Sequence, residues 1–454
     1  MATEIDSIDL NRYEIIKTRP MNKEATNVNV TNTSVPVTIG GQPISVTTDP
    51  GTGTKSAALD AFGRLRVSNP MTLFDSSHRY RDNNLWSTST ASSGAAVFDA
   101  NEGLVDLNVT TTSGSKVYRE TTKVFSYQPG KSLLVMTTFV MNPAKANLRQ
   151  RVGYYGASNG MYLELDGAGG NVLSFVERSS VSGSLAETKV AQSAWNYDKM
   201  DGTGPSKMTL DITKAQILWM DIEWLGLGTV RMGFVIDGKF ILCQQFHHAN
   251  LITSTYITTA SLPLRYEIEN TGATASNSVL KQICSTVISE GGYQLNGLQQ
   301  SINIPITAPR TTSTAGTYYP ITSLRLKSSP NFLDAVVILT ALSILGTGNG
   351  TNYSWKVVAS GTTTAGTWVS AGTNSAVEYN ITGTSFSGGR TLASGYINSS
   401  KDNSPSIDIL KEALFKFQLE RDTFTSTPFE LTFAVASDGG GSIFASLDFE
   451  EISR

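Results

Sequence analysis

The sequence predicts an all-β protein, in which an extended amino-terminal arm precedes two β-sandwich or jelly-roll-like domains. Apolar and small polar residues alternate along most of the chain, and a period of two is typical of strands. Asp-Gly and glycine-rich turns separate these runs. Charged residues make up only 16% of the 454 residues, below the roughly 25% of an average soluble protein. We therefore expect three segments: an arm and neck over 1–68, a first body domain over 69–290 and a second over 291–454.

The arm is expected to be extended, because valines and isoleucines alternate with small polar residues from Asn27 to Thr48. Two prolines and a Gly-Gly pair interrupt any long ladder, and the apolar residues are too few for an independent core. The strand therefore needs a sheet edge from another subunit, and the alternative is a leader without a partner. The predicted assembly contacts are Val28, Val30, Val35, Val37, Ile39, Ile44 and Val46.

A neck joins this arm to the body at residues 57–68, where low-complexity sequence gives way to strand patterns. Its predicted contacts are Phe62, Arg64, Leu65 and Arg66.

The first body domain contains the clearest strand succession, over residues 217–225, 230–236 and 239–243. Gly226-Leu227-Gly228 separates the first two runs, and Asp237-Gly238 separates the second pair. Asp-Gly between apolar runs is a strong hairpin signal, since both central positions of a type I′ turn need positive φ. Trp219, Asp221 and Glu223 share one strand face. The predicted core residues on the other faces are Met220, Ile222, Trp224, Met232, Phe234 and Ile236.

The second body domain begins near Gly291-Gly292 with a polar linker over 294–300 and a strand over 302–306. The apolar run 335–345 is too short to span a bilayer and predicts a buried strand. Further strands are expected over 353–358 and 446–451, and an outer loop or hairpin tip over 360–373. Helices are expected only over 407–415, just after Pro405, and over 6–17 in the arm.

Several motifs resemble a family of virion structural proteins of tailed bacteriophages, including phages of marine cyanobacteria. The resemblance begins at Asp60-Ala61-Phe62-Gly63-Arg64-Leu65-Arg66-Val67-Ser68 and continues through 70–75. The further matching segments are 219–235, 248–250, 262–268, 346–349, 353–355, 387–390 and 394–396. These motifs are structural rather than catalytic. The resemblance implies a virion component without fixing its position on the particle.

Composition excludes several function classes. The net charge of -3 and pI near 5.8 provide no basic stripe for nucleic acid. No signal peptide opens the chain and no run is long enough to span a membrane, so we expect synthesis in the host cytoplasm and residence in the virion. Cys243 and Cys284 are expected to be free thiols, with pairing as the alternative. No cofactor is expected, because the glycine-rich stretches lack a phosphate-loop ending.

Catalytic groups are sparse, since the chain has only three histidines, His78, His247 and His248. The His247-His248 pair could offer one imidazole to a metal, but neighbouring strand residues point to opposite faces, so one packed and one exposed ring are expected. Asp221 and Glu223 would lie roughly 7 Å apart on one strand face, a pairing used by glycoside hydrolases.

Two further groups of residues have competing interpretations. Glu164 and Asp166 repeat the spacing of the carboxylate pair, as solvent-facing acidic residues do. Trp86, Tyr154, Tyr155, Trp195 and Tyr197 could stack on sugar rings, although core or subunit contacts are the commoner use of such residues. We assign no catalytic, metal or cofactor residue.

The sequence therefore favours a non-enzymatic virion structural protein that docks through its arm and forms a head decoration, neck or tail-associated appendage or fibre. Its expected partners are capsid, neck or tail proteins and further copies of itself, with a trimer preferred. A carbohydrate-binding host-adhesion appendage that contacts host surface glycans is the alternative, followed by a glycan depolymerase.

Overall fold

A computed structural model describes residues 70–328, 332–399, 407–408 and 416–453. The predicted arm contacts between Val28 and Val46, the neck contacts between Phe62 and Arg66, and the helix expected over 6–17 lie outside these ranges. They stay predictions.

The regular secondary structure of the described residues consists mainly of strands and includes a short 3₁₀ helix, η1 (Gln192–Ala194). Every strand pairing is antiparallel. The all-β prediction is therefore confirmed. Within the described ranges, no helix has the length and hydropathy needed to cross a bilayer.

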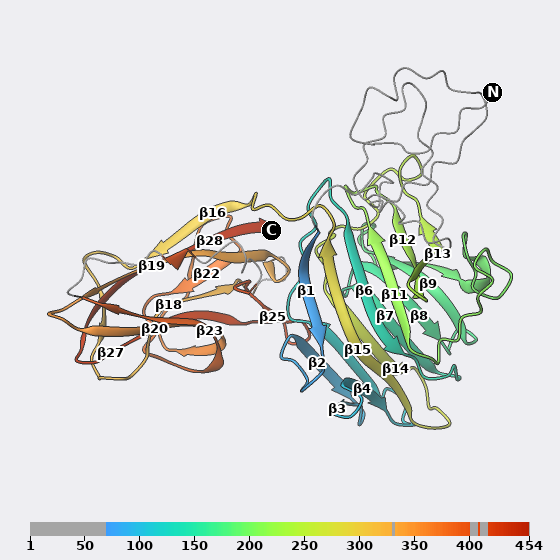
Figure 1. Cartoon of the computed structure of the whole chain (residues 1–454), viewed down its shortest axis with the longest axis horizontal. Coiled ribbons are helices and arrows are strands. Elements are labelled where there is room, and N and C mark those ends of the chain that lie inside the picture. The colour runs from blue at the N-terminus through green and yellow to red at the C-terminus, as the bar shows by residue number, and fades with distance from the viewer. Residues whose placement is uncertain (1–69, 329–331, 400–406, 409–415, 454) are drawn as a thin grey trace, which may run out of the picture. The chain divides into compact units, whose positions relative to one another are not determined.

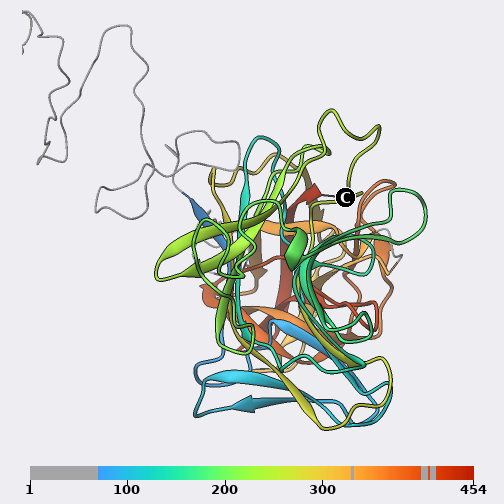
Figure 2. The same cartoon turned by 90° about the vertical axis from the view of Figure 1, so that its right-hand side faces the viewer.

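Two sheets with a shared core make up the first sandwich, coloured from blue to olive in Figure 1. The eight-stranded sheet contains β1 (Met71–Ser77), β3 (Ala95–Asp99), β4 (Leu104–Val109), β6 (Leu133–Val140), β11 (Gln216–Ile222), β12 (Val230–Ile236), β13 (Lys239–Phe246) and β15 (Ser278–Ser289). The seven-stranded sheet has the order β10 (Ala186–Ala191), β9 (Val172–Ser179), β8 (Gly160–Asp166), β7 (Leu148–Tyr155), β14 (Leu264–Asn270), β5 (Lys116–Thr121), β2 (Trp86–Ala91). In Figure 2, β11 to β13 and β7 to β9 lie in separate layers.

A second pair of sheets surrounds a second core. The five-stranded sheet contains β16 (Leu298–Asn303), β17 (Arg310–Thr312), β19 (Val336–Thr347), β24 (Ile407–Asp408) and β28 (Gly441–Ser453). The six-stranded sheet has the order β21 (Val369–Ser370), β22 (Val377–Asn380), β18 (Tyr319–Leu326), β27 (Glu430–Ser437), β20 (Asn352–Thr364), β23 (Ser385–Asn398). A small hairpin joins β25 (Arg421–Asp422) to β26 (Thr427–Pro428).

The predicted hairpins of the first domain are confirmed, because β11 pairs with β12 and β12 with β13. Asp237 and Gly238 have φ values of 50° and 72°, as the type I′ turn requires. Met220, Ile222, Met232 and Phe234 are buried in the core, with Trp224 and Ile236 partly buried beside them. The first strand ends at Ile222 instead of Leu225, so a seven-residue connection over 223–229 protrudes beyond the sheet.

Local pattern gave wrong assignments at two places in the second domain. The helix expected over 407–415 is wrong at its start, since Ile407 and Asp408 form β24 on β19; residues 409–415 lie outside the described ranges. Pairing with an existing strand overrides the helical propensity of such a short segment. The outer loop or hairpin tip expected over 360–373 is partly strand, because β20 continues to Thr364 and Val369–Ser370 form β21. The strands predicted at 335–345 and 446–451 are confirmed as β19 and β28. β19 is buried on both faces only from Val336 to Leu339; beyond Ala341 its residues alternate, and Leu345 is 52% exposed.

Candidate functional site: an ion-pair ladder on the seven-stranded sheet

The seven-stranded sheet carries an unusual set of side chains on the face that points away from the core. Along β7, Val152 and Tyr154 belong to the core, and the alternation of a strand sends Arg151 and Tyr155 to the opposite face. The same alternation in neighbouring strands brings charged and tyrosine side chains together. We call this surface the outer face.

A continuous series of ion pairs crosses the outer face, and we call it the ion-pair ladder. Its members, in order across the sheet, are Lys189, Glu164, Arg151, Glu267, Arg265 and Glu120, from β10, β8, β7, β14, β14 and β5. Lys189 Nζ lies 2.6 Å from Glu164 Oε1, and Arg151 Nε lies 2.6 Å from Glu164 Oε2. Arg151 Nη1 lies 3.0 Å from Glu267 Oε1, and Arg265 Nη2 lies 3.0 Å from Glu267 Oε2. Arg265 Nη1 lies 3.3 Å from Glu120 Oε2.

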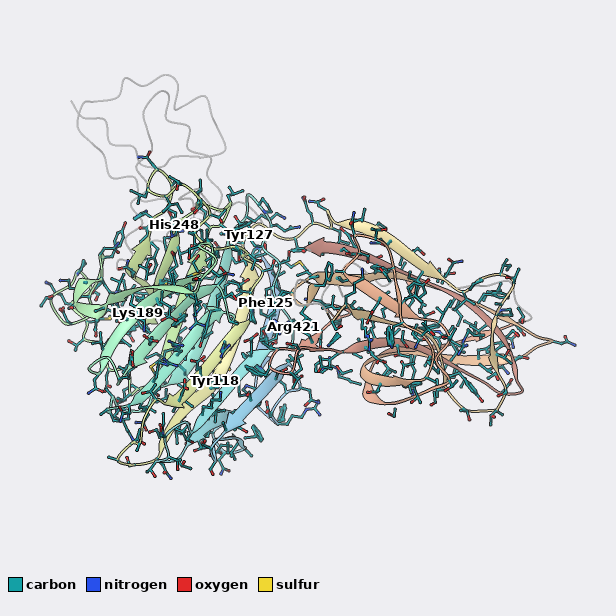
Figure 3. The ribbon with its side chains drawn as sticks, turned by 180° about the vertical axis from the view of Figure 1, so that it is seen from behind. Tyr118, Phe125, Tyr127, Lys189, His248 and Arg421 are labelled. Carbon is teal, nitrogen blue, oxygen red and sulfur yellow. The ribbon has the colours of Figure 1, made fainter. Side chains whose placement is uncertain are left out.

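The ladder continues into the second sandwich through Arg421 of β25. Its Nη2 atom lies 3.6 Å from Glu120 Oε1, and the guanidinium also pairs with Asp334. The ring of Phe424, in the turn after β25, lies 5.6 Å from the Arg265 guanidinium. In Figure 3, Lys189 and Arg421 mark the two ends of this region, and Tyr118 lies between them.

Glu187 forms a branch beside the ladder. It accepts hydrogen bonds from Arg178 Nη2 at 2.8 Å and from the Tyr162 hydroxyl at 2.6 Å. Partial burial opposes ionisation, but these bonds and the charges of Arg151 and Arg178 lower the pKa of Glu187 to about 2. This carboxylate is therefore ionised throughout the neutral range.

The tyrosines of the outer face lie under the guanidinium groups and are not exposed. Tyr155 and Tyr162 are both 0% exposed, with ring centroids 4.4 Å apart. Arg178 lies 5.3 Å and 5.1 Å from their respective centroids. Cation–π contacts of this kind gain strength when the cation is desolvated. Both rings are already occupied, so they offer no platform to a sugar ring.

Burial affects two glutamates of the ladder in opposite ways. Burial alone would raise the pKa of Glu267, but the charges of Arg265, Arg151 and further arginines hold it below its ordinary value. Burial raises the pKa of Glu120 in spite of Arg265 and Arg421. Glu267 is thus stabilised as an anion, whereas ionised Glu120 has a desolvation cost that its partners do not fully offset.

Sequence reasoning missed the ladder, and it misread one of its members. Glu164 was expected to face solvent, yet its side chain is only 1% exposed between Arg151 and Lys189. The available signal was the repetition of charged residues at every second position in three separate strands, Arg149/Arg151, Glu164/Asp166 and Arg265/Glu267/Glu269. Only the sheet order, which the sequence does not give, brings these runs together.

The pair proposed for glycan cleavage does not form two matched strand carboxylates. Asp221 is the penultimate residue of β11 and pairs with Arg231 Nη2 at 2.7 Å. Glu223 lies beyond the strand end, and its backbone N–H donates to Thr229 O. The regular two-residue spacing assumed for the pair therefore ends at Ile222.

The aromatic candidates are dispersed. Trp86, Tyr154 and Trp195 are buried among core residues, and Tyr155 belongs to the outer face. Tyr197 is 49% exposed, on a segment that bonds to the edge of β13. The five residues do not form one surface.

The remaining candidates are placed as follows. His248 is buried and His247 exposed, as expected for adjacent residues at a strand end. His78 is buried, and burial lowers its pKa to about 4. Cys243 and Cys284 are free thiols. Within the described ranges, no three His, Cys, Asp or Glu side chains are grouped as metal ligands.

No family model matches the chain, and no curated protein matches it. Several solved structures are similar to about half of it. The carbohydrate recognition domain of Emp47p has a TM-score of 0.32 at 12% identity, covering 48% of this chain and 96% of that one. A glycosyl hydrolase family protein from Mycobacterium fortuitum has a TM-score of 0.33 at 10% identity, covering 48% and 99%. A carbohydrate esterase from the Shiga toxin-encoding bacteriophage phi24B has a TM-score of 0.30 at 15% identity, covering 49% and 99%.

Proposed function

We propose that this chain is a non-enzymatic structural subunit of a tailed-phage virion, attached through its amino-terminal arm and forming a head decoration, neck or tail-associated appendage. The observation that carries the proposal is the ion-pair ladder, which connects six residues on five strands of one sheet to the second sandwich. Buried ion pairs add little net stability but impose a fixed geometry when each charge is paired. A network of this kind would keep the shape of the body constant within a particle.

The chemistry of the outer face also favours a structural role over glycan cleavage. A glycoside hydrolase needs one carboxylic acid that stays protonated near neutral pH beside one carboxylate. The pKa values of Glu267 and Glu187 are both lowered by neighbouring arginines. Those two groups serve as fixed anions, and the arginines that hold them also cover the tyrosine rings. Burial raises the pKa of Glu120, but this carboxyl is 0% exposed and lies between Arg265 and Arg421, so it is not accessible to a substrate.

The second sandwich offers a surface for assembly at β23. This strand has 14 residues and pairs with β20 along one side; within the described ranges it has no second strand neighbour. Its sequence contains one charged residue, Arg390, and no proline. Charges and prolines are the usual protection of an edge strand against pairing with another chain. The edge of β23 therefore suits contact between copies of the subunit.

The mass of the purified full chain, measured by light scattering at several concentrations, tests the proposal. We expect a stable multimer whose mass does not change when glycans are added. Replacing Thr391 and Ser394 of β23 with lysine should reduce the multimer, whereas lysines at Ser182 and Ser184, in an exposed loop of the first sandwich, should not. A monomer at all concentrations contradicts the proposed self-assembly.

A glycan-binding host-adhesion appendage is the alternative proposal. It predicts that added glycans change the mass or the thermal stability of the chain. The arm is tested separately, by deleting residues 1–56 and measuring incorporation into particles of the phage that encodes the chain. The docking role of the arm predicts a folded body that fails to join particles, and full incorporation of the shortened chain contradicts it.

A further inference from the structure

Two neighbouring loops at one end of the first sandwich expose large aliphatic side chains. The connection 223–229 carries Leu225 and Leu227, which are 56% and 41% exposed. The segment after β13 carries Leu251 and Ile252, which are 71% and 37% exposed. We call these four residues the aliphatic tip. Large apolar groups gathered on protruding loops mark a contact site more often than isolated exposed residues do.

The two loops are bonded to each other, so the four residues lie on adjoining segments of backbone. The Tyr256 backbone N–H donates to Gly226 O at 3.0 Å, and the Tyr256 hydroxyl donates to Glu223 O at 3.2 Å. A Cβ atom at Gly226 would lie 2.8 Å from Thr255 Cγ2, which shows how closely the loops approach. His248 Nδ1 lies 2.5 Å from Gly228 O. Figure 3 places His248 at this end of the sandwich.

Leu225 adopts a backbone conformation that leucine rarely takes, with φ at 39°. Glycine would fit this position without strain, and glycine occupies the next position of the same loop. A strained residue persists only where its surroundings hold it, and such residues are concentrated at functional sites. The side chain of Leu225 is itself exposed, so core packing does not account for the choice of leucine.

The tip is suited to the interface of a bilayer, because the exposed polar residues beside it, Asn250, Thr253, Ser254 and Thr255, are uncharged. Residues 224–229 and 249–255 contain no ionisable side chain, and the connection 223–229 begins with the partly buried Glu223. The backbone N–H groups of Leu251 and Ile252 both donate to His248 O, and that of Leu227 donates to Trp224 O. In lipid, a backbone donor without a partner costs several kcal/mol, so internal pairing of these groups removes an obstacle to insertion. An aqueous protein interface makes no such demand, because water can satisfy exposed donors there.

We propose that the aliphatic tip is a membrane-contact site that inserts into the interface of an uncharged, zwitterionic lipid bilayer. The absence of Lys and Arg from residues 224–229 and 249–255 gives these loops no electrostatic preference for anionic lipid. The contact goes beyond the proposed structural role, since it assigns the subunit a surface that recognises lipid.

Flotation of the full chain with phosphatidylcholine vesicles tests the proposal. The chain should float with the vesicles, and 0.5 M salt should not release it, because apolar insertion is not screened. Replacing Leu225, Leu227 and Leu251 with serine should weaken binding at least about tenfold. The matched control replaces Leu185, Leu298 and Leu345 with serine. These three leucines lie outside the aliphatic tip and are 57%, 44% and 52% exposed. The control variant should float like the original chain.

Leu225→Gly provides an independent test because it removes the side chain and relieves the strained φ. We expect this variant to unfold at the same or a higher temperature and yet to bind vesicles more weakly. Failure of the original chain to float, release by salt, or equal loss of binding in the control variant would each overturn the proposal. The measurement contains no glycan and does not depend on the multimer mass, so it is separate from the test of the structural role.

Discussion

Arg151 is the residue on which the ion-pair ladder depends, because its guanidinium contacts both Glu164 and Glu267. These two carboxylates have side chains that are only 1% and 2% exposed. Arg151→Met therefore leaves buried anions with fewer partners, and we expect the free energy of unfolding to fall by about 3–5 kcal/mol. Urea denaturation measures the change.

Arg149→Met is the control for this substitution, since Arg149 is on the same strand and pairs with Glu269 at 2.6 Å. Its side chain is 26% exposed, so water can solvate the partner that it leaves behind. A loss of less than about 1 kcal/mol is expected there. Equal losses of unfolding free energy in the two variants would show that the burial of Arg151 and its partners does not determine the effect.

The opposite pKa directions of Glu267 and Glu120 predict opposite responses to neutralisation. Glu267→Gln removes an anion that its arginines stabilise, so it should destabilise the protein at pH 7. Glu120→Gln removes an anion with a net desolvation cost, so it should be neutral or stabilising.

The same comparison has a defined pH dependence. The lowered folded pKa of Glu267 gives stability that is present above the unfolded value near 4.5 and is lost as pH falls through the folded pKa. Melting temperatures of both variants between pH 3 and 8 measure this. A destabilising Glu120→Gln substitution at pH 7 would contradict the assignment.

At the scale of elements, His248 fastens the loop 223–229 to β9. Its Nε2 atom lies 2.7 Å from Glu177 Oε2, and its ring stacks on Tyr256 with centroids 3.9 Å apart. Nδ1 of His248 donates to Gly228 O. Because a carbonyl oxygen and an ionised carboxylate can only accept, both ring nitrogens must carry a proton when Glu177 is ionised. Burial alone would lower the pKa of His248, but the bond and charge of Glu177 raise it above 6.5.

This arrangement predicts stability that depends on protonated His248. Because the folded pKa is raised, the contribution is fully present below pH 6.5 and is lost as pH rises through the folded value. His248→Gln should cost about 2 kcal/mol at pH 6 and less at pH 9. His247→Gln is the control, since that ring is exposed. Thermal unfolding of both variants between pH 6 and pH 9 measures this difference. A loss of stability in His248→Gln that does not change with pH would contradict the contribution of protonated His248.

His78 acts in the opposite direction and must be separated from His248 in any such titration. Burial lowers its pKa to about 4, so its neutral form gives stability that is lost as pH falls from 6.5 towards 4. The histidine-dependent losses above and below pH 6.5 therefore belong to different residues.

The strands that the sequence predicts best are those whose environment is local. Asp237-Gly238 specifies its hairpin by backbone chemistry alone, and the alternation of β11 and β12 indicates the buried side. β19 was predicted as a buried strand, and its first four residues are covered on both faces. Val336 and Ile338 enter the first core, whereas Val337 and Leu339 enter the second.

The ladder and the aliphatic tip could not be predicted in the same way, because both depend on elements that are distant in the sequence. Arg151 and Glu267 meet only because β14 lies beside β7. The loop of Leu225 and the segment of Leu251 adjoin where the Tyr256 backbone N–H donates to Gly226 O. The expected strand through Leu225 also hid the protruding loop, since two glycines close to an apolar run are equally typical of a tight turn.

At the scale of the described body, contacts between the two sandwiches decide whether they unfold together. Gln418 Nε2 donates to Val124 O at 3.0 Å, and Lys123 Nζ lies 3.3 Å from Glu420 Oε1. The backbone N–H of Arg421 donates to Thr122 O at 3.1 Å. These bonds lie near β19, whose residues belong to both cores. The boundary between the two sandwiches is therefore a packed junction rather than a flexible linker.

A junction of this kind predicts one cooperative unfolding transition for the two sandwiches. Arg421→Met removes the guanidinium that contacts Glu120 and Asp334 and leaves Glu120 buried at the boundary. Scanning calorimetry should then resolve two transitions, because each sandwich keeps its own core while the coupling between them weakens. Arg325→Met removes an ion pair with Glu378 inside the second sandwich and should shift the single transition without splitting it. Two separate transitions in the unaltered chain would mean that the sandwiches are independent, and the ladder would then stiffen the first sandwich alone.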